Sequence, residues 1–361
     1  MIIDRYLIVE ILQTLIAVLI VLLLIFMGRY FAVFLADAAA GEITSTVVLD
    51  LLLLRTISAL NMMLPFALYI SVLLAFGRLY RDNEMTALAA SGIGVSRALF
   101  TVFILGTLFA IIVGFISLWL SPWAEAQRAT ITLESEKVSI VETVLPGQFN
   151  ELGKRKDAVF YVEEITKDRK TFENVFVQIQ VKDNLDIFSA AKAYLYKDNE
   201  TGDRYVVLVD GFRYRGVPGQ QDFVIQEYEK NAIRIVAPKI STSSRRKKDL
   251  PTSQLIENAR PRDQAELQWR FSMPLSTLLL AVLGVVISRT SPRQGRFGKL
   301  FVAIMVYVIY NNLMSIARSW VEQGKVPVEV GIWWVHLLIF AMFGFLLFQQ
   351  VTGKRFRLRP A

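Results

Sequence analysis

Cysteine is absent from this sequence of 361 residues, and histidine occurs once, at position 336. Without cysteine, the chain can form neither a disulfide bond nor a thiolate metal site. A single histidine also excludes metal sites that gather several imidazoles. We therefore expect no metal site and no catalytic residue in this chain. His336 stands beside two tryptophans, which favours helix packing or an aromatic belt at a membrane surface.

Charged residues are scarce as well, at 20%, whereas hydrophobic residues make up 54%. Soluble domains contain about 25% charged residues on average. The apolar residues stand in blocks long enough for a bilayer, which needs roughly 20 helical residues. These blocks predict an integral membrane protein. The net charge of +8 does not indicate a nucleic-acid partner, because the basic residues cluster beside the apolar blocks.

Six apolar runs predict six transmembrane helices, three on each side of a polar middle section. They cover about residues 7–35, 47–77, 98–120, 271–288, 300–320 and 331–351. The first run is about twice as long as the core of a signal peptide, so we interpret it as a membrane helix. The third run is expected to stop at Ser121 and Pro122. The predicted division is residues 1–121, a middle domain over 122–265, and residues 266–361.

Short segments of alternating apolar and polar residues fill the middle section and predict β-strands. They are residues 159–165, 175–181, 205–209, 223–228 and 233–236. Turn-forming residues separate these segments. Regularly spaced short strands are typical of a β-sandwich or jelly roll, so we expect an inserted all-β, jelly-roll-like domain.

Basic residues are distributed unequally over the connections between the apolar runs. Residues 289–299 contain four basic and no acidic residues, and residues 354–359 carry four more basic residues. By contrast, residues 36–48 contain no lysine or arginine, and residues 322–330 contain only Lys325. The positive-inside rule then places both termini in the cytosol and the β domain on the outer side of the membrane.

The connection between the second and third runs, residues 78–97, predicts a short cytosolic helix over about residues 83–91. Asp82 or Asn83 can cap such a helix, and Glu84 in the first turn suits the positive helix end.

Met85, Leu88 and Ala89 recur at helical spacing and form one small apolar face. A helix of about two turns is marginal alone, so we expect a groove on another protein to hold this face. A tight turn at the lipid headgroups is the alternative.

An energy source is missing from the sequence. The nearest approach to a phosphate-binding loop, residues 147–154, has its glycines one residue too far apart, and Arg155 stands where Ser or Thr should bind magnesium. Carboxylates are nearly absent from the centres of the apolar runs, and Asp50 lies near the end of one. If the chain moves a substrate, we expect a partner to supply the energy.

Three arginines lie in or beside the predicted outer ends of helices: Arg29, Arg55 and Arg318. Near an interface such side chains can reach the headgroup region and act as anchors. Alternatively, they bind the phosphates of an anionic lipid, because guanidinium groups match phosphate oxygens.

Five segments, taken in order, resemble the LptF/LptG permeases of the bacterial lipopolysaccharide exporter. They are residues 1–7 (MIIDRYL), 78–97, 266–274 (ELQWRFSMP), 291–296 (SPRQGR) and 333–336 (WWVH). The resemblance covers the whole chain, and the opening segment looks closer to the LptF branch. The β section matches by pattern rather than by motif.

The resemblance implies one half of a permease heterodimer that extracts lipopolysaccharide from the outer leaflet of the inner membrane. The other half would be an LptG-like subunit. An LptB-like cytosolic ATPase dimer would hold the ATP and magnesium, so this chain itself would be neither an enzyme nor bound to a cofactor. An LptC-like protein with its own jelly roll would receive the lipid on the periplasmic side.

The resemblance also assigns residues. The helix at 83–91 matches the family's coupling helix, with Asp82, Glu84, Met85 and Leu88 at the ATPase contact. The first and fifth membrane helices match those that line the lateral gates of the lipid cavity. Arg29 lies in the family's lipid-phosphate region, and we extend that role to Arg55 and Arg318.

Two other classes of protein are alternatives to a permease. An envelope sensor or assembly factor would bind a ligand with the β domain and use the helices as anchors, but a sensor should carry a cytosolic signalling domain, and the cytosolic segments are short. An intramembrane enzyme would need polar catalytic groups at one depth, and the sequence shows no such group.

Overall fold

The computed structural model describes residues 2–39, 43–142, 146–152, 158–166, 171–181, 184–197, 204–217, 224–235, 247–258, 260–289 and 296–352. The chain divides into two compact units. One is helical and comprises residues 1–35, 48–131 and 245–361, and the other comprises residues 36–47 and 132–244 and contains the β-sheet. The basic tail and residues 290–295, on which the orientation prediction partly rests, lie outside the described residues.

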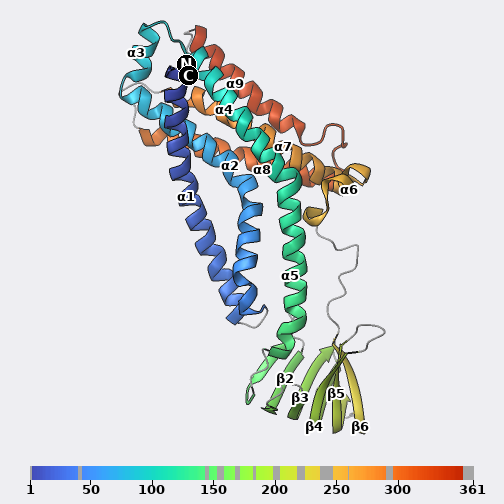
Figure 1. Cartoon of the computed structure of the whole chain (residues 1–361). Helices are drawn as coiled ribbons and strands as arrows, with labels where there is room; N and C mark the ends of the chain where they lie inside the picture. The colour runs from blue at the N-terminus through green and yellow to red at the C-terminus, as the bar shows by residue number, and fades with distance from the viewer. Residues whose placement is uncertain are drawn as a thin grey trace, which may run out of the picture. The chain divides into compact units, whose positions relative to one another are not determined.

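The helical elements occur in two groups (Figure 1). Those before the sheet are α1 (Ile2–Ala39), η1 (Ser45–Val47), α2 (Val48–Arg81), α3 (Glu84–Ala90), α4 (Val95–Phe115), the π-helical η2 (Ile116–Leu120) and α5 (Ser121–Glu142). Those after it are η4 (Lys247–Asp249), α6 (Thr252–Glu257), α7 (Pro261–Ser288), α8 (Arg296–Glu322) and α9 (Trp333–Thr352).

Within the described residues, six helical stretches are long and apolar enough to cross a membrane. They are Ile2–Ala39, Ser45–Arg81, Val95–Thr132, Pro261–Ser288, Gly298–Glu322 and Trp333–Gln350. Each contains one of the six apolar runs of the sequence, or nearly all of it. The predicted architecture of three helices, a β domain and three helices is therefore confirmed.

The expected end of the third helix at Ser121 and Pro122 is wrong. The helix passes from α4 through η2 into α5 without a break. Proline has no N–H and so leaves the carbonyl of residue i−4, here Leu118, without its usual helical donor. The hydroxyl of Thr252 donates a hydrogen bond to this Leu118 carbonyl. The backbone oxygen freed by Pro122 is thus satisfied by α6, and the helix continues.

Helix α7 lies at the core of the helical unit. In its most apolar stretch 61% of the residues are buried, the same share as in the stretch that contains α2, against 11% in that of α1. Helices α2 and α4 approach α7 closely at positions where a glycine has no side chain. A Cβ atom on Gly284 would lie 3.2 Å from Val72 and 3.3 Å from the Tyr69 carbonyl of α2, and one on Gly106 of α4 would lie 3.2 Å from Leu278. These close approaches fix α2 and α4 against α7.

The β unit contains one antiparallel six-stranded sheet. Its strands are β1 (Phe149–Leu152), β2 (Ala158–Ile165), β3 (Thr171–Val181), β4 (Asn184–Lys197), β5 (Arg204–Gly216) and β6 (Val224–Ile235). Each strand pairs with the next in the chain. Alternate side chains such as Phe160 and Val162 on β2 and Phe172 on β3 form a buried apolar cluster on one face.

The order of these strands differs from a jelly roll. A jelly roll is built from Greek keys, in which a long connection returns a strand beside the first. The described strands instead form a meander, because each strand pairs with the next strand in the chain. The prediction of an inserted β domain is confirmed, while its jelly-roll topology is not found in the described strands.

Candidate functional site

The predicted cytosolic helix exists as α3, and its start differs from the expectation. Asn83 occupies the N-cap position with φ 60° and ψ 9°, in the left-handed region that asparagine tolerates, and its side chain makes no capping hydrogen bond. The carboxylate of Asp82 accepts a hydrogen bond from Arg81 Nε at 2.9 Å. This bond lowers the pKa of Asp82, which therefore stays ionised. In the described contacts neither Asn83 nor Asp82 caps α3 with its side chain, so the predicted side-chain cap is wrong.

Helix α3 ends at Ala90, close to the predicted end at about residue 91. Gly92 adopts φ +84°, and the N–H of Ile93 donates to the Leu88 carbonyl at 2.9 Å. A left-handed glycine after the last turn is the common way to end a helix.

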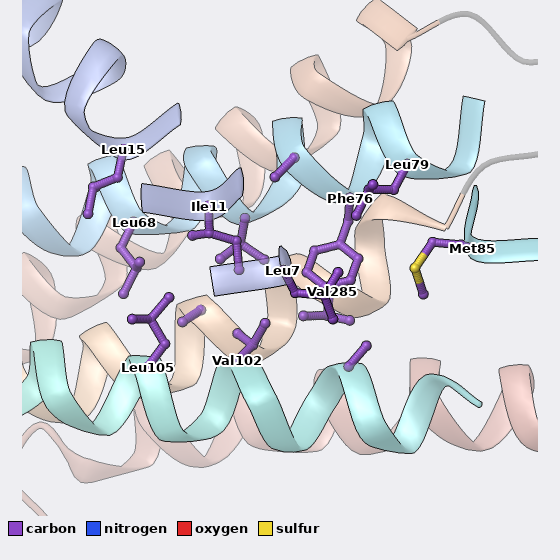
Figure 2. Packing of buried hydrophobic residues seen from close by; sticks show 14 of the residues in the cluster. Leu7, Ile11, Leu15, Leu68, Phe76, Leu79, Met85, Val102, Leu105 and Val285 are labelled. Atoms are coloured by element: carbon purple, nitrogen blue, oxygen red, sulfur yellow. The ribbon is translucent and has the colours of Figure 1, made fainter. Parts of the chain in front are cut away.

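The apolar face of α3 contacts this chain's own core. Met85 is buried in one cluster with Leu7 of α1, Phe76 of α2 and Val285 of α7 (Figure 2). Leu88 is half-buried against the same cluster. The prediction that a partner's groove holds the whole face is corrected for Met85 and for part of Leu88, because α1, α2 and α7 of this chain cover them. Ala89, the third residue of the predicted face, stays exposed. The exposed residues of the predicted helix, 83–91, are Asn83, Thr86, Ala87, Ala89, Ala90 and Ser91.

Glu84 is held by α1 and α2. The hydroxyl of Tyr6 donates a hydrogen bond to Glu84 Oε2 at 2.6 Å. Arg78 Nη2 lies 3.9 Å from Glu84 Oε1, and Arg78 Nη1 lies 2.8 Å from Glu10. The Glu84 side chain remains 37% exposed. Its carboxylate therefore has one oxygen engaged by α1 and still faces solvent.

A second polar contact joins α1 to α4. Arg97 donates two hydrogen bonds to the carboxylate of Asp4, at 2.8 and 2.6 Å, and Thr101 donates a third at 2.9 Å. Sequence reasoning missed Asp4, Tyr6 and Glu10. The available signal was the presence of two acids and a tyrosine at one end of an otherwise apolar helix.

Two of the three predicted arginines lie together. Arg29 is exposed, with its guanidinium 5.7 Å from the ring of Tyr30. Arg55 stands over the same ring at 4.9 Å and donates to the Tyr30 hydroxyl at 3.2 Å. Glu125 on α5 accepts from Arg55 at 3.3 Å and from Arg128 at 2.7 Å. Three arginines and one carboxylate therefore leave this region with a net positive charge.

Arg318 has different surroundings. It donates to Glu266 on α7 at 2.6 Å and to Glu322 at 3.1 Å, and its guanidinium lies 5.1 Å from the Trp269 ring. Glu266 also pairs with Arg270 at 3.2 Å, and the side chains of both are nearly fully buried. Two carboxylates thus neutralise Arg318, and no described contact links it to Arg29 or Arg55.

His336 belongs to helix packing. It is 4% exposed, and its Nδ1 lies 2.8 Å from the hydroxyl of Tyr310. That hydroxyl is hydrogen-bonded to Ser276 on α7 at 2.5 Å. The contact joins α7, α8 and α9, so the packing interpretation of His336 is confirmed.

The sequence model of the family described as "Lipopolysaccharide export system permease LptF/LptG" matches residues 5–349. The chain belongs to this family. Proteins named "Lipopolysaccharide export system permease protein LptF" from Escherichia coli (strain K12) and from Shigella flexneri are each 27% identical to it. Each alignment covers 99% of this chain and 98% of the relative.

The LptF/LptG match runs through both helical groups and the β insert, so it covers the segments that carried the resemblance in the sequence except residues 1–4. The predicted membership is confirmed, and with it the description as a transmembrane lipopolysaccharide export permease. The matched length also agrees with a permease subunit rather than with a β domain that is merely anchored by helices.

Proposed function

We propose that this chain is the LptF-like half of a permease heterodimer that extracts lipopolysaccharide from the outer leaflet of the inner membrane. An LptG-like subunit forms the other half. An LptB-like cytosolic ATPase dimer, which holds ATP and magnesium, drives the cycle, and an LptC-like jelly-roll protein receives the lipid. The observation that carries the proposal is the family match over residues 5–349.

The position of the motor follows from the orientation. With both termini in the cytosol, α3 and the exposed side of Glu84 face the cytosolic ATPase, and the sheet faces the periplasm. Asp82 and Glu84 are proposed as the acidic contacts. Met85 and Leu88 are proposed to act from within, because their packing joins α3 to the rest of the membrane helices.

The lipid phosphates are proposed to bind at Arg29 and Arg55. Arg29 is exposed, and its strongest described partner is an aromatic ring, so its donors are available to a phosphate. Arg55 shares its charge with Glu125. Arg318 was assigned the same role from the sequence. Its two carboxylate partners argue against that role, since a phosphate would have to displace Glu266 or Glu322.

Transfer to the partner's β domain is proposed to use an edge of the sheet. The terminal strands β1 and β6 each pair on one side with a single described neighbour. An unpaired edge presents backbone donors and acceptors to which another sheet can add a strand. The alternative of an envelope sensor or assembly factor is not favoured by any observation, because the family match is to a permease.

Purification of the tagged chain in a mild detergent tests this assignment. We expect a second LptF/LptG-type permease and a nucleotide-binding ATPase to be recovered with it in fixed proportion. Recovery of well-folded chain with neither subunit, but with a cytosolic signalling protein, would favour the sensor alternative instead.

A further inference from the structure

The buried residues of helix α1 lie near its first end. Its buried residues are Leu7, Ile11 and Leu15. Farther along the helix, large apolar side chains from Ile16 to Leu35 are exposed, for example Leu24 at 67%. Proteins seldom leave such a stripe without a lipid or protein neighbour. In this chain, therefore, the buried contacts of α1 belong to its first four turns, and farther along the Tyr30 hydroxyl accepts a hydrogen bond from Arg55 of α2.

Those turns contact three separate elements. Asp4 binds Arg97 on α4, and Glu10 binds Arg78 on α2. The Tyr6 hydroxyl reaches α3 itself through Glu84. Leu7 lies in the same apolar cluster as Met85 of α3 (Figure 2). The short helix that faces the motor is thus bonded to α1 by one hydrogen bond and by apolar packing.

The far part of the same helix carries the proposed lipid site. α1 is continuous and contains no proline. Tyr6 and Arg29 are 23 residues apart, which corresponds to about 35 Å along a helix. A helix of this kind moves as one body, so a displacement imposed near Tyr6 also displaces Arg29.

We propose that Tyr6 is a positioning residue that transmits motion of α3 to the Arg29 region through α1. This inference rests on the proposed function. Glu84 is suited to the task because a carboxylate has two oxygens. Oε2 is held by Tyr6, while Oε1 lies 3.9 Å from Arg78 and can meet a basic group of the motor. One side chain then connects the ATPase to α1.

Tyr6→Phe tests the proposal, because it removes the hydroxyl and keeps the ring. The variant is assembled with the second permease subunit and the ATPase in vesicles that contain lipopolysaccharide. ATP hydrolysis and ATP-driven lipid release are measured together. We expect the lipid released per ATP hydrolysed to fall by about threefold or more, the scale on which single residues alter coupling between distant sites. ATP hydrolysis should continue.

Thr14→Val is the matched control. It also removes one hydroxyl from α1, but Thr14 bonds only to the Glu10 carbonyl of its own helix in the described contacts. Its release per ATP should equal that of the unmodified transporter. Tyr6→Phe should add no further loss to Glu84→Ala, because Glu84→Ala already removes the carboxylate to which the Tyr6 hydroxyl donates.

The outcomes separate the two proposals. If the unmodified assembly shows no ATP-driven release, the proposed function fails. If the unmodified assembly does release lipid, the role of Tyr6 alone is overturned by either of two results: Tyr6→Phe releases as much lipid per ATP as the unmodified assembly, or it adds a full further loss to Glu84→Ala. An equal fall in ATP hydrolysis and release would also overturn it, because Tyr6 would then support motor docking. Should Tyr6→Phe assemble poorly, Glu10→Gln weakens the contact between α1 and Arg78 and is expected to lower the same ratio.

Discussion

Glu84 shows what a single carboxylate contributes to this permease. Sequence reasoning placed it in the first turn of a short helix and assigned it to a partner contact. The structure places Glu84 in that first turn, with one carboxylate oxygen bonded to Tyr6. The intramolecular bond could not be foreseen, because Tyr6 lies 78 positions away in the chain. Local periodicity reports a helix face but not which distant side chain meets it.

We predict that Glu84→Ala and Glu84→Lys weaken binding or coupling of the ATPase without unfolding the permease. The residue is partly exposed, so its loss leaves no buried cavity, and the Lys variant reverses the charge offered to the motor. Recovery of the ATPase with the tagged permease and ATP-driven lipid release are the measurements. Glu134→Ala, at an exposed glutamate on α5, is the control. Undiminished release in both Glu84 variants would remove this residue from the coupling role.

The arginines illustrate the limit of sequence reasoning at the same scale. Arg29, Arg55 and Arg318 were equivalent in the sequence because each lies near the end of an apolar run. In the structure they differ in their partners: an aromatic ring for Arg29, one carboxylate for Arg55 and two for Arg318. Glu125 and Glu266 come from other helices, and the sequence does not show which helices lie side by side.

We expect Arg29→Ala to lower the lipid-stimulated rate of ATP hydrolysis more than the basal rate, because it removes an exposed guanidinium from the proposed phosphate site. Arg5→Ala is the control, since Arg5 is also an exposed arginine on α1 but stands at the other end. The assay compares hydrolysis by the assembled transporter with and without lipopolysaccharide. An equal loss of both rates would instead assign Arg29 to anchoring.

Among the elements, α7 determines how the helical unit is packed. Its motif ELQWRFSMP supported the family resemblance, and the structure shows the physical reason for two of these residues. The Glu266 and Arg270 side chains are nearly fully buried and paired, and the Glu266 carboxylate also binds Arg318 of α8. Arg270 donates further to the hydroxyl of Thr252 on α6. One buried carboxylate therefore joins α7 to α8.

Glu266→Gln is expected to destabilise the permease by about 3 kcal/mol or more, because removing one partner of a buried pair leaves uncompensated charge. Glu322→Gln is the matched control. Glu322 pairs with the same Arg318 but is 26% exposed, so the expected loss is much smaller. Thermal unfolding in detergent measures both. Equal stability of the two variants would contradict the importance of burial at this contact.

Element boundaries were the least predictable part of the fold. The third apolar run stops near Ser121, and proline commonly ends a helix, yet α5 continues because Thr252 satisfies the carbonyl that Pro122 leaves free. That hydroxyl belongs to a segment more than 120 positions away. The strands were found by their alternation, whereas their meander order depends on pairing that periodicity does not encode.

At the scale of the whole molecule, sequence reasoning predicted six membrane helices, an inserted β domain and the family. Hydrophobic length is a strong signal, because a bilayer requires a minimum span and each backbone group must be satisfied within it. The hydrogen bond between Tyr6 of α1 and Glu84 of α3 was missed because the two residues lie 78 positions apart in the sequence. The central claim is that this chain supplies the path and the linkage, and a separate ATPase supplies the energy.

The most direct test places the purified chain in vesicles that contain lipopolysaccharide, first alone and then with the second permease subunit and the ATPase. The account predicts no ATP hydrolysis by the chain alone, and lipid release only when ATP and the complete assembly are present. Hydrolysis of ATP by the chain alone, or release without the ATPase, would contradict it.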